Sequence, residues 1–296
     1  MPVCEAAALA VDPRIENSEG GTVSSYAGMR VKGNSHGFVG GYRGSHHSFS
    51  CSVIGRQGEE MQRDYWSETC RDYRDLPSPA LVGRTAGERT LRRLGTQRLS
   101  TRETPVVFVA EVARSLFGNL VNAITGSSLY RNASFLLDHL GKPVFPAFMH
   151  IHEQPLLKKA LGSAPYDAEG VATRARDIVT DGVLQGYLLD SYAARKLGLQ
   201  STASAGGVRN AGIRSSGQDY ETLLRQMDTG LVVTELMGQG TNLVTGDYSR
   251  GAAGFWVEGG EIQYPVEEVT VAGNLNDMYR GLVAVGSDND VPGSID

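Results

Sequence analysis

The stretch from Thr229 to Asn274 constrains the fold of this chain more than any other. Its apolar runs are short and rich in Val, Thr, Phe, Trp and Tyr, and glycines separate them. Strand-forming residues interrupted by glycine predict an antiparallel sheet with tight turns. Gly259 and Gly260 stand between FWVE and EIQYPV, which is the signal of a two-residue β-hairpin. Because the chain contains 37 glycines, we expect such turns throughout.

Composition and charge exclude several classes of protein. The formal net charge of −5 argues against a large nucleic-acid surface. No apolar run approaches the ~20 residues that a membrane-spanning helix needs, and no signal peptide follows Met1. Cys4, Cys51 and Cys70 match no zinc or CxxC spacing, so reduced thiols are the simplest interpretation. We therefore expect a cytoplasmic protein that binds neither nucleic acid nor a membrane.

The first part of the chain alternates in the manner of β-strands. Residues 15–75 predict a meander of four or five strands, with turns at 34–37 and at Gly40-Gly41. A proline-bounded helix follows in ALVGRTAGERTLRRLG, with Gly95 as its C-cap. The basic residues of this region are interpreted as a solvated helix face; they are Arg84, Arg89, Arg92, Arg93 and Arg98. A domain boundary is expected near residue 100.

The second part mixes strands and helices. A short buried strand at 106–109 precedes apolar residues at helical spacing up to residue 124. Asp181-Gly182 predicts a hairpin, the segment 219–227 predicts an amphipathic helix closed by Gly230, and NLNDMYRGLVAV predicts a final helix. We therefore predict an α+β fold of mainly antiparallel, glycine-rich sheets with a few flanking helices, in two domains, 1–100 and 101–296.

One long segment carries a resemblance to a known family. ELMGQG followed by GDYSRGAAGFWVEGGEIQYPVEEVTVAGNL resembles the C-terminal part of PmbA/TldE proteins. These are one half of the TldD/PmbA family, the modulators of DNA gyrase. Measured against that family, the chain begins inside the N-terminal half and ends before a last pair of strands, in the polar sequence VPGSID. The resemblance thus predicts a chain truncated at both ends, with the end of a central domain in 1–100 and an incomplete C-terminal domain in 101–296.

The resemblance also locates a zinc motif that this chain has lost. The TldD half carries HExxxH, in which two imidazoles bind zinc and the glutamate polarises water. That motif falls on residues 110–115, where Glu111 is kept but Ala110 and Ser115 replace the histidines. Because a methyl group cannot bind zinc and a neutral hydroxyl binds it poorly, we expect no metal and no catalytic residue on this chain. Glu111 is a vestigial candidate only.

A pair of histidines offers an alternative metal site. His150 and His152 are two residues apart, so on a strand they share one face, a spacing that can bind zinc. The pair lies between Pro146 and Pro155, which favours an exposed connection. A self-sufficient hydrolase that uses these histidines with Glu153 is one hypothesis for the function.

The favoured hypothesis follows from the resemblance. It implies a subunit of a metallopeptidase complex that cleaves small or unfolded peptides, in peptide-antibiotic maturation and antitoxin degradation. Zinc is then expected on a TldD-like partner, and this chain alone is expected to be inactive. Small residues let another backbone approach, so candidate contacts with the peptide or the partner are Gly238, Gly240, Gly246, Gly251 and Gly254. Two alternatives stay open: these glycines serve tight turns only, or the chain is a non-enzymatic binding protein that modulates DNA gyrase or another partner.

Overall fold

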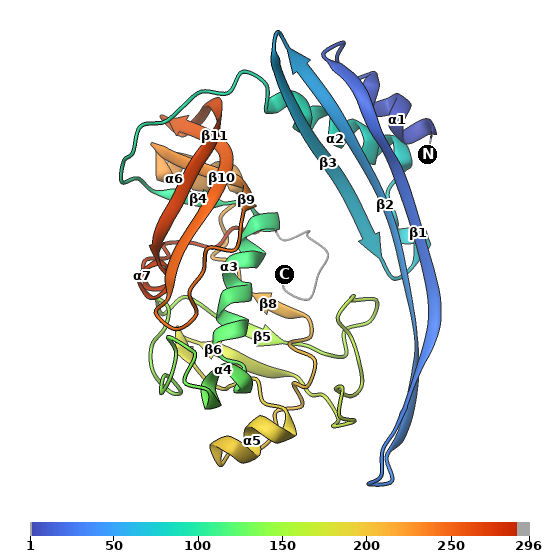
Figure 1. Cartoon of the computed structure of the whole chain (residues 1–296), viewed down its shortest axis with the longest axis vertical. Helices are drawn as coiled ribbons and strands as arrows, with labels where there is room; N and C mark the ends of the chain where they lie inside the picture. Colours follow the sequence, from blue (N-terminus) through green and yellow to red (C-terminus); the bar gives the residue numbers. More distant parts are fainter. Residues whose placement is uncertain (1, 289–296) are drawn as a thin grey trace.

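A three-stranded antiparallel sheet forms one side of the molecule in the computed structural model, which describes residues 2–288. Its strands are β1 (Ile15–Gly33), β2 (Val39–Gln57) and β3 (Glu60–Cys70), in the order β1-β2-β3. Figure 1 shows β1 and β2 running along the whole length of the molecule. The turn expected at 34–37 is present. The expected four or five strands are wrong: there are three, because Gly40 and Gly41 take extended backbone and continue β2 instead of turning.

Two helices pack on the end of this sheet. They are α1 (Pro2–Leu9) and α2 (Pro79–Arg92), and a single 3-10 turn, η1 (Tyr73–Asp75), follows β3. The Ser78 side chain accepts a hydrogen bond from the Leu81 N–H and so caps the start of α2. The helices and the sheet share a small apolar core, whose fully buried members include Cys4, Ala8, Cys51, Val53, Val82 and Ala86.

The glycine-rich stretch builds the second sheet. Its order is β11-β10-β9-β4, where β9 is Gly230–Met237, β10 is Asp247–Glu258, β11 is Glu261–Asn274 and β4 is Val106–Phe108. Only β4 is parallel to its neighbour. Gly259 and Gly260 connect β10 to β11 with φ of +61° and +75°, as a hairpin turn of the primed type requires. The hairpin predicted from the sequence is therefore confirmed.

A third sheet of short strands lies beside the second. Its order is β7-β6-β5-β8, formed by β5 (Ile151–Glu153), β6 (Arg176–Thr180), β7 (Val183–Leu184) and β8 (Ala211–Ile213). The predicted hairpin at Asp181-Gly182 joins β6 to β7, with φ of +50° and +74° at the two residues.

Five helices complete the larger part of the molecule. They are α3 (Ala110–Ala123), α4 (Gly126–Tyr130), α5 (Ser191–Leu197), α6 (Tyr220–Met227) and α7 (Leu275–Arg280). The apolar face of α3 enters the main core through Leu116, Phe117 and Leu120, as its spacing predicts. The expected closure of α6 by Gly230 is wrong, because Asp228 caps the helix with φ of +58° and Gly230 begins β9.

Helices flanking three mainly antiparallel sheets confirm the α+β prediction. Among residues 2–288, no helix has the length and apolar character that crossing a bilayer requires. The division into two domains at residue 100 stays a prediction. The final sequence VPGSID lies outside the described residues.

Candidate functional site

A cleft of about 1100 Å³ separates the end of α2 from the start of α3. On one side, α2 and β3 contribute charged groups, which are Arg89, Arg92, Arg93 and Asp64. On the other side, β4, α3, α6 and the β10–β11 hairpin contribute apolar groups, among them Val107, Phe108, Tyr220, Leu223, Phe255 and Ile262. The cleft therefore joins an ionic rim to an apolar wall, a combination that is typical of ligand sites.

Ion pairs connect the two sides of this cleft. Arg89 Nη1 lies 2.9 Å from Glu111 Oε1 on α3, and Arg89 Nε lies 3.6 Å from Asp64 Oδ2 on β3. Arg93 Nη1 lies 2.6 Å from Glu235 Oε2 on β9 and 3.7 Å from Asp64. Charge-assisted contacts of this kind are shorter and stronger than neutral ones. The network therefore joins the first 100 residues to the rest of the chain.

This network corrects the interpretation of the α2 arginines as a solvated face. The side chains of Arg89 and Arg93 are only 27% and 18% exposed. The Arg89 guanidinium also lies over the Trp66 ring, 5.0 Å from its centroid. Arg84 and Arg92 are exposed, as expected. The sequence pattern missed the difference because the acidic partners come from three distant segments.

The start of α3 does not offer a zinc site. Ala110 has no donor atom, and the Ser115 hydroxyl already donates to the Val112 carbonyl at 2.8 Å. Arg250 on β10 directs Nη1 toward the Ser115 oxygen at 3.4 Å. A guanidinium at this place repels a metal cation, and the Glu111 carboxylate is engaged by Arg89. The residues present therefore do not fit the zinc ion that the HExxxH motif of the TldD half would hold at this place.

Sequence reasoning missed Arg250 as a member of this site. The residue lies among glycine-rich strand positions, and its guanidinium also donates to the Leu236 carbonyl at 3.3 Å. Side chains alternate between the two faces of a strand. That alternation could have identified Arg250. Asp247 and Ser249 face solvent, so Arg250 lies on the opposite face of β10.

The two histidines do not lie in the exposed connection that we expected. His152 is part of β5, an inner strand paired with β6 and β8, and its ring packs against Gly212. His150 lies just before β5, with Nε2 3.4 Å from Asp181 Oδ1. The flanking prolines misled the prediction, because the short segment between them forms a strand that is paired on both sides.

Glu153 is not available as a third ligand for that pair. Its carboxylate is buried, accepts from Arg176 Nε at 2.7 Å, and accepts from the Arg209 N–H at 2.7 Å. Within residues 2–288 we find no group of three or more His, Cys, Asp or Glu side chains that could hold a metal ion.

The five candidate glycines fall into two groups. Gly238 and Gly246 have φ of +75° and +83°, and a β-carbon at Gly240 or Gly254 would overlap a carbonyl oxygen of a neighbouring segment. A β-carbon at Gly251 would lie 3.4 Å from Met237 Cβ, which is ordinary contact. The backbone of this chain alone thus accounts for four of these glycines. Contact with a peptide or a partner stays a prediction for all five.

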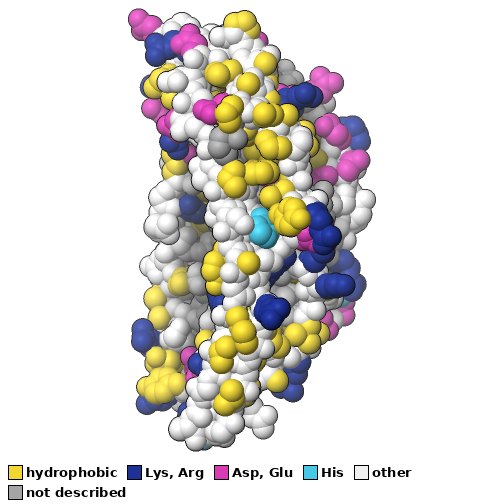
Figure 2. Space-filling model, turned by 90° about the vertical axis from the view of Figure 1, so that its right-hand side faces the viewer, with side chains coloured by type: hydrophobic (Ala, Val, Ile, Leu, Met, Phe, Trp, Pro, Cys, Tyr) yellow, Lys and Arg dark blue, Asp and Glu magenta, His cyan; other side chains and the backbone are white. Residues whose placement is uncertain are grey.

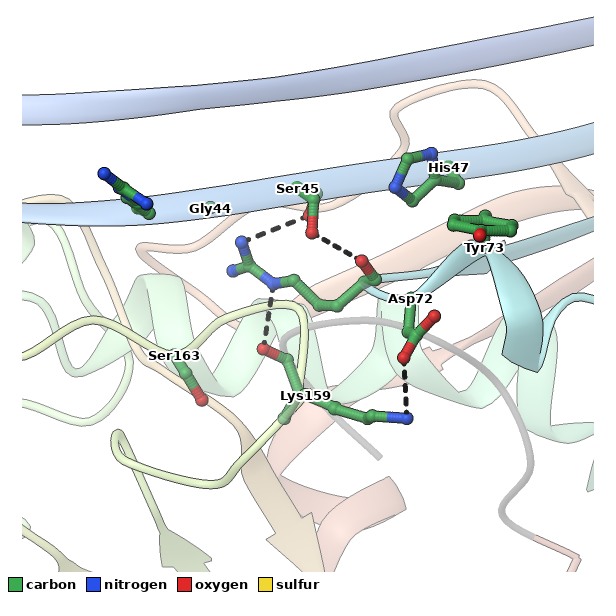
Figure 3. A pocket seen from close by; sticks show the side chains of 10 residues that line it. Gly44, Ser45, His47, Asp72, Tyr73, Lys159 and Ser163 are labelled. Carbon is green, nitrogen blue, oxygen red and sulfur yellow. Dashed lines mark hydrogen bonds and ion pairs between the residues drawn. The ribbon is translucent and has the colours of Figure 1, made fainter.

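A second, polar pocket of about 490 Å³ lies where β2 meets the loop near Lys159. Figure 3 shows Lys159 and Asp72 pointing toward one another beneath Gly44 and Ser45. Lys159 Nζ lies 3.1 Å from Asp72 Oδ2. Hydrogen bonds from Arg74, and then from Lys159, hold the pKa of Asp72 well below its ordinary value. The Arg71 guanidinium donates to the carbonyls of Ala160 and Leu161. These charged side chains bind other groups of the same protein. Their contacts therefore hold the first sheet against that loop.

Comparison with known proteins agrees with this architecture. Residues 3–94 match the PmbA/TldA metallopeptidase central domain, and residues 101–296 match the C-terminal domain of the same family. The chain is 55% identical to metalloprotease PmbA of Escherichia coli O157:H7 over 284 residues, which cover 96% of this chain and 63% of that protein. It therefore spans less than two thirds of the length of this curated relative.

Solved structures show the same fold. The chain matches a crystal structure of a proposed modulator of DNA gyrase from Bacteroides thetaiotaomicron with a TM-score of 0.92 and 30% identity, covering 99% of this chain and 67% of that one. TldE from Thermococcus kodakarensis matches with a TM-score of 0.83 and 22% identity, over 96% and 66% of the two chains, which shows the fold alone. The resemblance inferred from the glycine-rich segment is confirmed, and the chain belongs to the PmbA/TldD metallopeptidase family.

Proposed function

We propose that this chain is the non-zinc subunit of a TldD/PmbA-type metallopeptidase complex in the cytoplasm. The observation that carries the proposal is the start of α3, where Ala110 and Ser115 stand at the histidine positions and Arg250 faces Ser115. Such a site cannot activate water through zinc. The metal and the hydrolytic step then belong to a TldD-like partner, and the complex cleaves small or unfolded peptides, as in peptide-antibiotic maturation and antitoxin degradation.

In this proposal the cleft of this chain holds peptide. Strand β4 is the last strand of its sheet, so one of its edges has no strand partner among the described residues, and Val106 to Phe108 line the cleft. An extended peptide can pair with such an edge through its main chain. The apolar wall accepts peptide side chains, while the network of Arg89, Arg93 and their acidic partners fixes the opposite rim.

Reconstitution tests the proposal. The chain and a TldD-like subunit that carries HExxxH, both from the same organism, are purified separately and mixed with an unfolded peptide. We expect cleavage by the mixture and none by this chain alone. Replacing the motif glutamate of the partner by glutamine should abolish cleavage, whereas Glu111→Gln in this chain should not. Cleavage by this chain alone would refute the proposal.

The structural relative described as a modulator of DNA gyrase favours a second candidate function. In that alternative the chain binds gyrase or another protein without hydrolysis and needs no TldD-like partner. A pull-down from the source cells, read by mass spectrometry, separates the two. Recovery of gyrase without any HExxxH protein would favour the binding function over the peptidase complex.

A further inference from the structure

Two hydrogen-bond donors without partners lie on opposite walls of the cleft. Arg92, the last residue of α2, lines the cleft, is exposed, and forms no ion pair with an acid of the described chain. Its neighbours Arg89 and Arg93 are both held by acids. On the other wall Tyr220 begins α6, and its hydroxyl makes no hydrogen bond within residues 2–288. Both groups are therefore available to a ligand of the cleft.

The charge of Arg92 reaches the Tyr220 hydroxyl. Burial raises the pKa of the Tyr220 hydroxyl, and the nearby Arg92 guanidinium opposes that rise. The hydroxyl therefore stays protonated near neutral pH and can donate. Three acids raise this pKa further, and they are Glu221, Asp288 and Glu111. None of the three pairs with Arg92 in the part of the chain that the structure describes. A guanidinium and a hydroxyl that both donate suit the two oxygens of a carboxylate.

Apolar side chains surround the hydroxyl. Val107 and Phe255 line the same wall and pack in one cluster with Tyr220. The exposed apolar groups of the first sheet lie elsewhere. Figure 2 shows hydrophobic side chains distributed along the side of the molecule that β1 occupies, and Val23 and Tyr26 of that strand do not line the cleft. Apolar surroundings strengthen an ionic hydrogen bond, so the cleft wall favours a carboxylate that arrives with apolar neighbours.

The free edge of β4 determines how an extended peptide lies in the cleft. The Val109 N–H donates to the Val233 carbonyl on β9 at 3.1 Å. Because main-chain groups alternate along a strand, Val107 also directs its groups toward β9, whereas Val106 and Phe108 direct theirs to the open edge. Neither of these two has a main-chain partner within residues 2–288. A peptide strand can therefore pair with them.

The two faces of β4 sort the side chains of such a peptide. Val107 points to the face covered by α6, where it packs with Tyr220. Val106 and Phe108 pack with Val112 of α3 on the other face. Directly paired residues share a face, so a peptide residue beside Val107 directs its side chain toward Tyr220, and its two neighbours direct theirs toward α3. An acidic residue between two apolar residues therefore matches both faces.

We propose that the cleft selects peptides in which a carboxylate lies beside apolar residues, and that this carboxylate binds between the Arg92 guanidinium and the Tyr220 hydroxyl. The inference rests on the proposed function, because it takes the ligand of the cleft to be a peptide. The carboxylate belongs to an aspartate or glutamate side chain or to the C-terminus of the peptide, since both supply the same two oxygens. Each donor makes a charge-assisted hydrogen bond, and loss of Arg92 should weaken binding about tenfold.

Fluorescence anisotropy of short labelled peptides tests this selection on the purified chain. The first peptide carries Val-Asp-Val at its centre and an amidated C-terminus. The second has asparagine in place of aspartate, and the third is the asparagine peptide with a free C-terminal carboxylate. We expect the first or the third peptide to bind at least about tenfold more tightly than the second, and the tighter of the two identifies the source of the carboxylate. Equal affinity for all three peptides, or binding of none, would overturn the proposal.

Variants locate the carboxylate. Arg92→Gln should weaken binding of the preferred peptide about tenfold, and Tyr220→Phe should weaken it about threefold or more. Both variants should leave the affinity for the amidated asparagine peptide unchanged. Arg84→Gln is the matched control, because Arg84 is exposed on the same helix but does not line the cleft. Circular dichroism confirms that each variant is folded. Equal effects of Arg92→Gln and Arg84→Gln, or equal losses for all peptides, would contradict the assignment.

The reconstituted pair separates this inference from the proposed function. With a TldD-like partner, Arg92→Gln should raise KM for the preferred peptide about tenfold and keep kcat within about threefold. Cleavage of the preferred peptide with the same KM by the Arg92→Gln and wild-type pairs would overturn the carboxylate site and leave the peptidase proposal standing. Binding that depends on Arg92, without cleavage by the pair, would support the carboxylate site and overturn the peptidase proposal.

Discussion

Glu111→Gln asks whether the acid at the start of α3 takes part in chemistry. Its carboxylate lies 2.9 Å from Arg89 Nη1, and the two side chains are 30% and 27% exposed. A hydrogen bond to a charged group contributes about 1.5–3 kcal/mol, and an exposed ion pair only about 0.2–1 kcal/mol. Because the pair is partly exposed and Arg89 keeps Asp64 at 3.6 Å, we expect a loss of about 1 kcal/mol, or roughly 2–4 °C in Tm.

Thermal unfolding and peptide cleavage by the reconstituted pair are measured on the same preparations. Glu235→Gln is the matched control, since Glu235 forms the equivalent ion pair with Arg93 but lies outside the motif. If Glu111 only joins α3 to α2, both variants lose similar stability and keep kcat within about threefold. A kcat loss of ~100-fold for Glu111→Gln alone, with pairing and fold intact, would show that this carboxylate acts in proton transfer.

Four further outcomes follow from the geometry. Elemental analysis of the purified chain should find no stoichiometric zinc; about one tightly held ion per chain would contradict the account of α3. Gly254→Ala should lose about 3 kcal/mol of unfolding free energy in a denaturant titration, because its methyl group overlaps the Val232 carbonyl. The unfolding free energy of Gly251→Ala should stay within about 0.5 kcal/mol of that of the wild type. Reduced cleavage by this variant would therefore support contact of Gly251 with the peptide or the partner. Unchanged cleavage would show that Gly251 is structural only. Burial raises the pKa of the Cys51 thiol to about 12. Alkylation, measured by mass spectrometry, should therefore modify the half-buried Cys70 before Cys51. Faster labelling of Cys51 in the folded chain would refute its burial.

Turns were predictable because their signals are local. Gly259-Gly260 and Asp181-Gly182 need positive φ at two consecutive positions, which few residue pairs tolerate. Gly198 ends α5 in the left-handed conformation, which few residues other than glycine adopt easily. The periodicity of α3 was also visible, because its buried face repeats along one contiguous segment.

Features that depend on distant partners were not predictable. Gly40-Gly41 resembles a turn in isolation, but pairing with β1 keeps it extended. His152 lies between prolines in the sequence, yet pairing on both sides places its strand inside a sheet. In each case the deciding hydrogen bonds come from a different segment, so a local pattern could not show them.

The resemblance placed Ala110, Glu111 and Ser115 at the motif positions from the sequence of one helix, but it could not show which groups surround them. The positive groups that now surround that helix come from α2 and β10, and Arg250 is 135 residues away from Ser115 in sequence. No spacing rule connects such positions.

The retained Glu111 now has a physical explanation that needs no metal. A carboxylate in a partly enclosed cleft is costly unless a cation compensates it. Arg89 supplies that charge, with Nη1 2.9 Å from Glu111 Oε1. The arginine belongs to α2, so the same contact that neutralises the acid also holds the first 100 residues against the rest of the molecule. Glu111 is therefore part of the contact that joins α3 to α2.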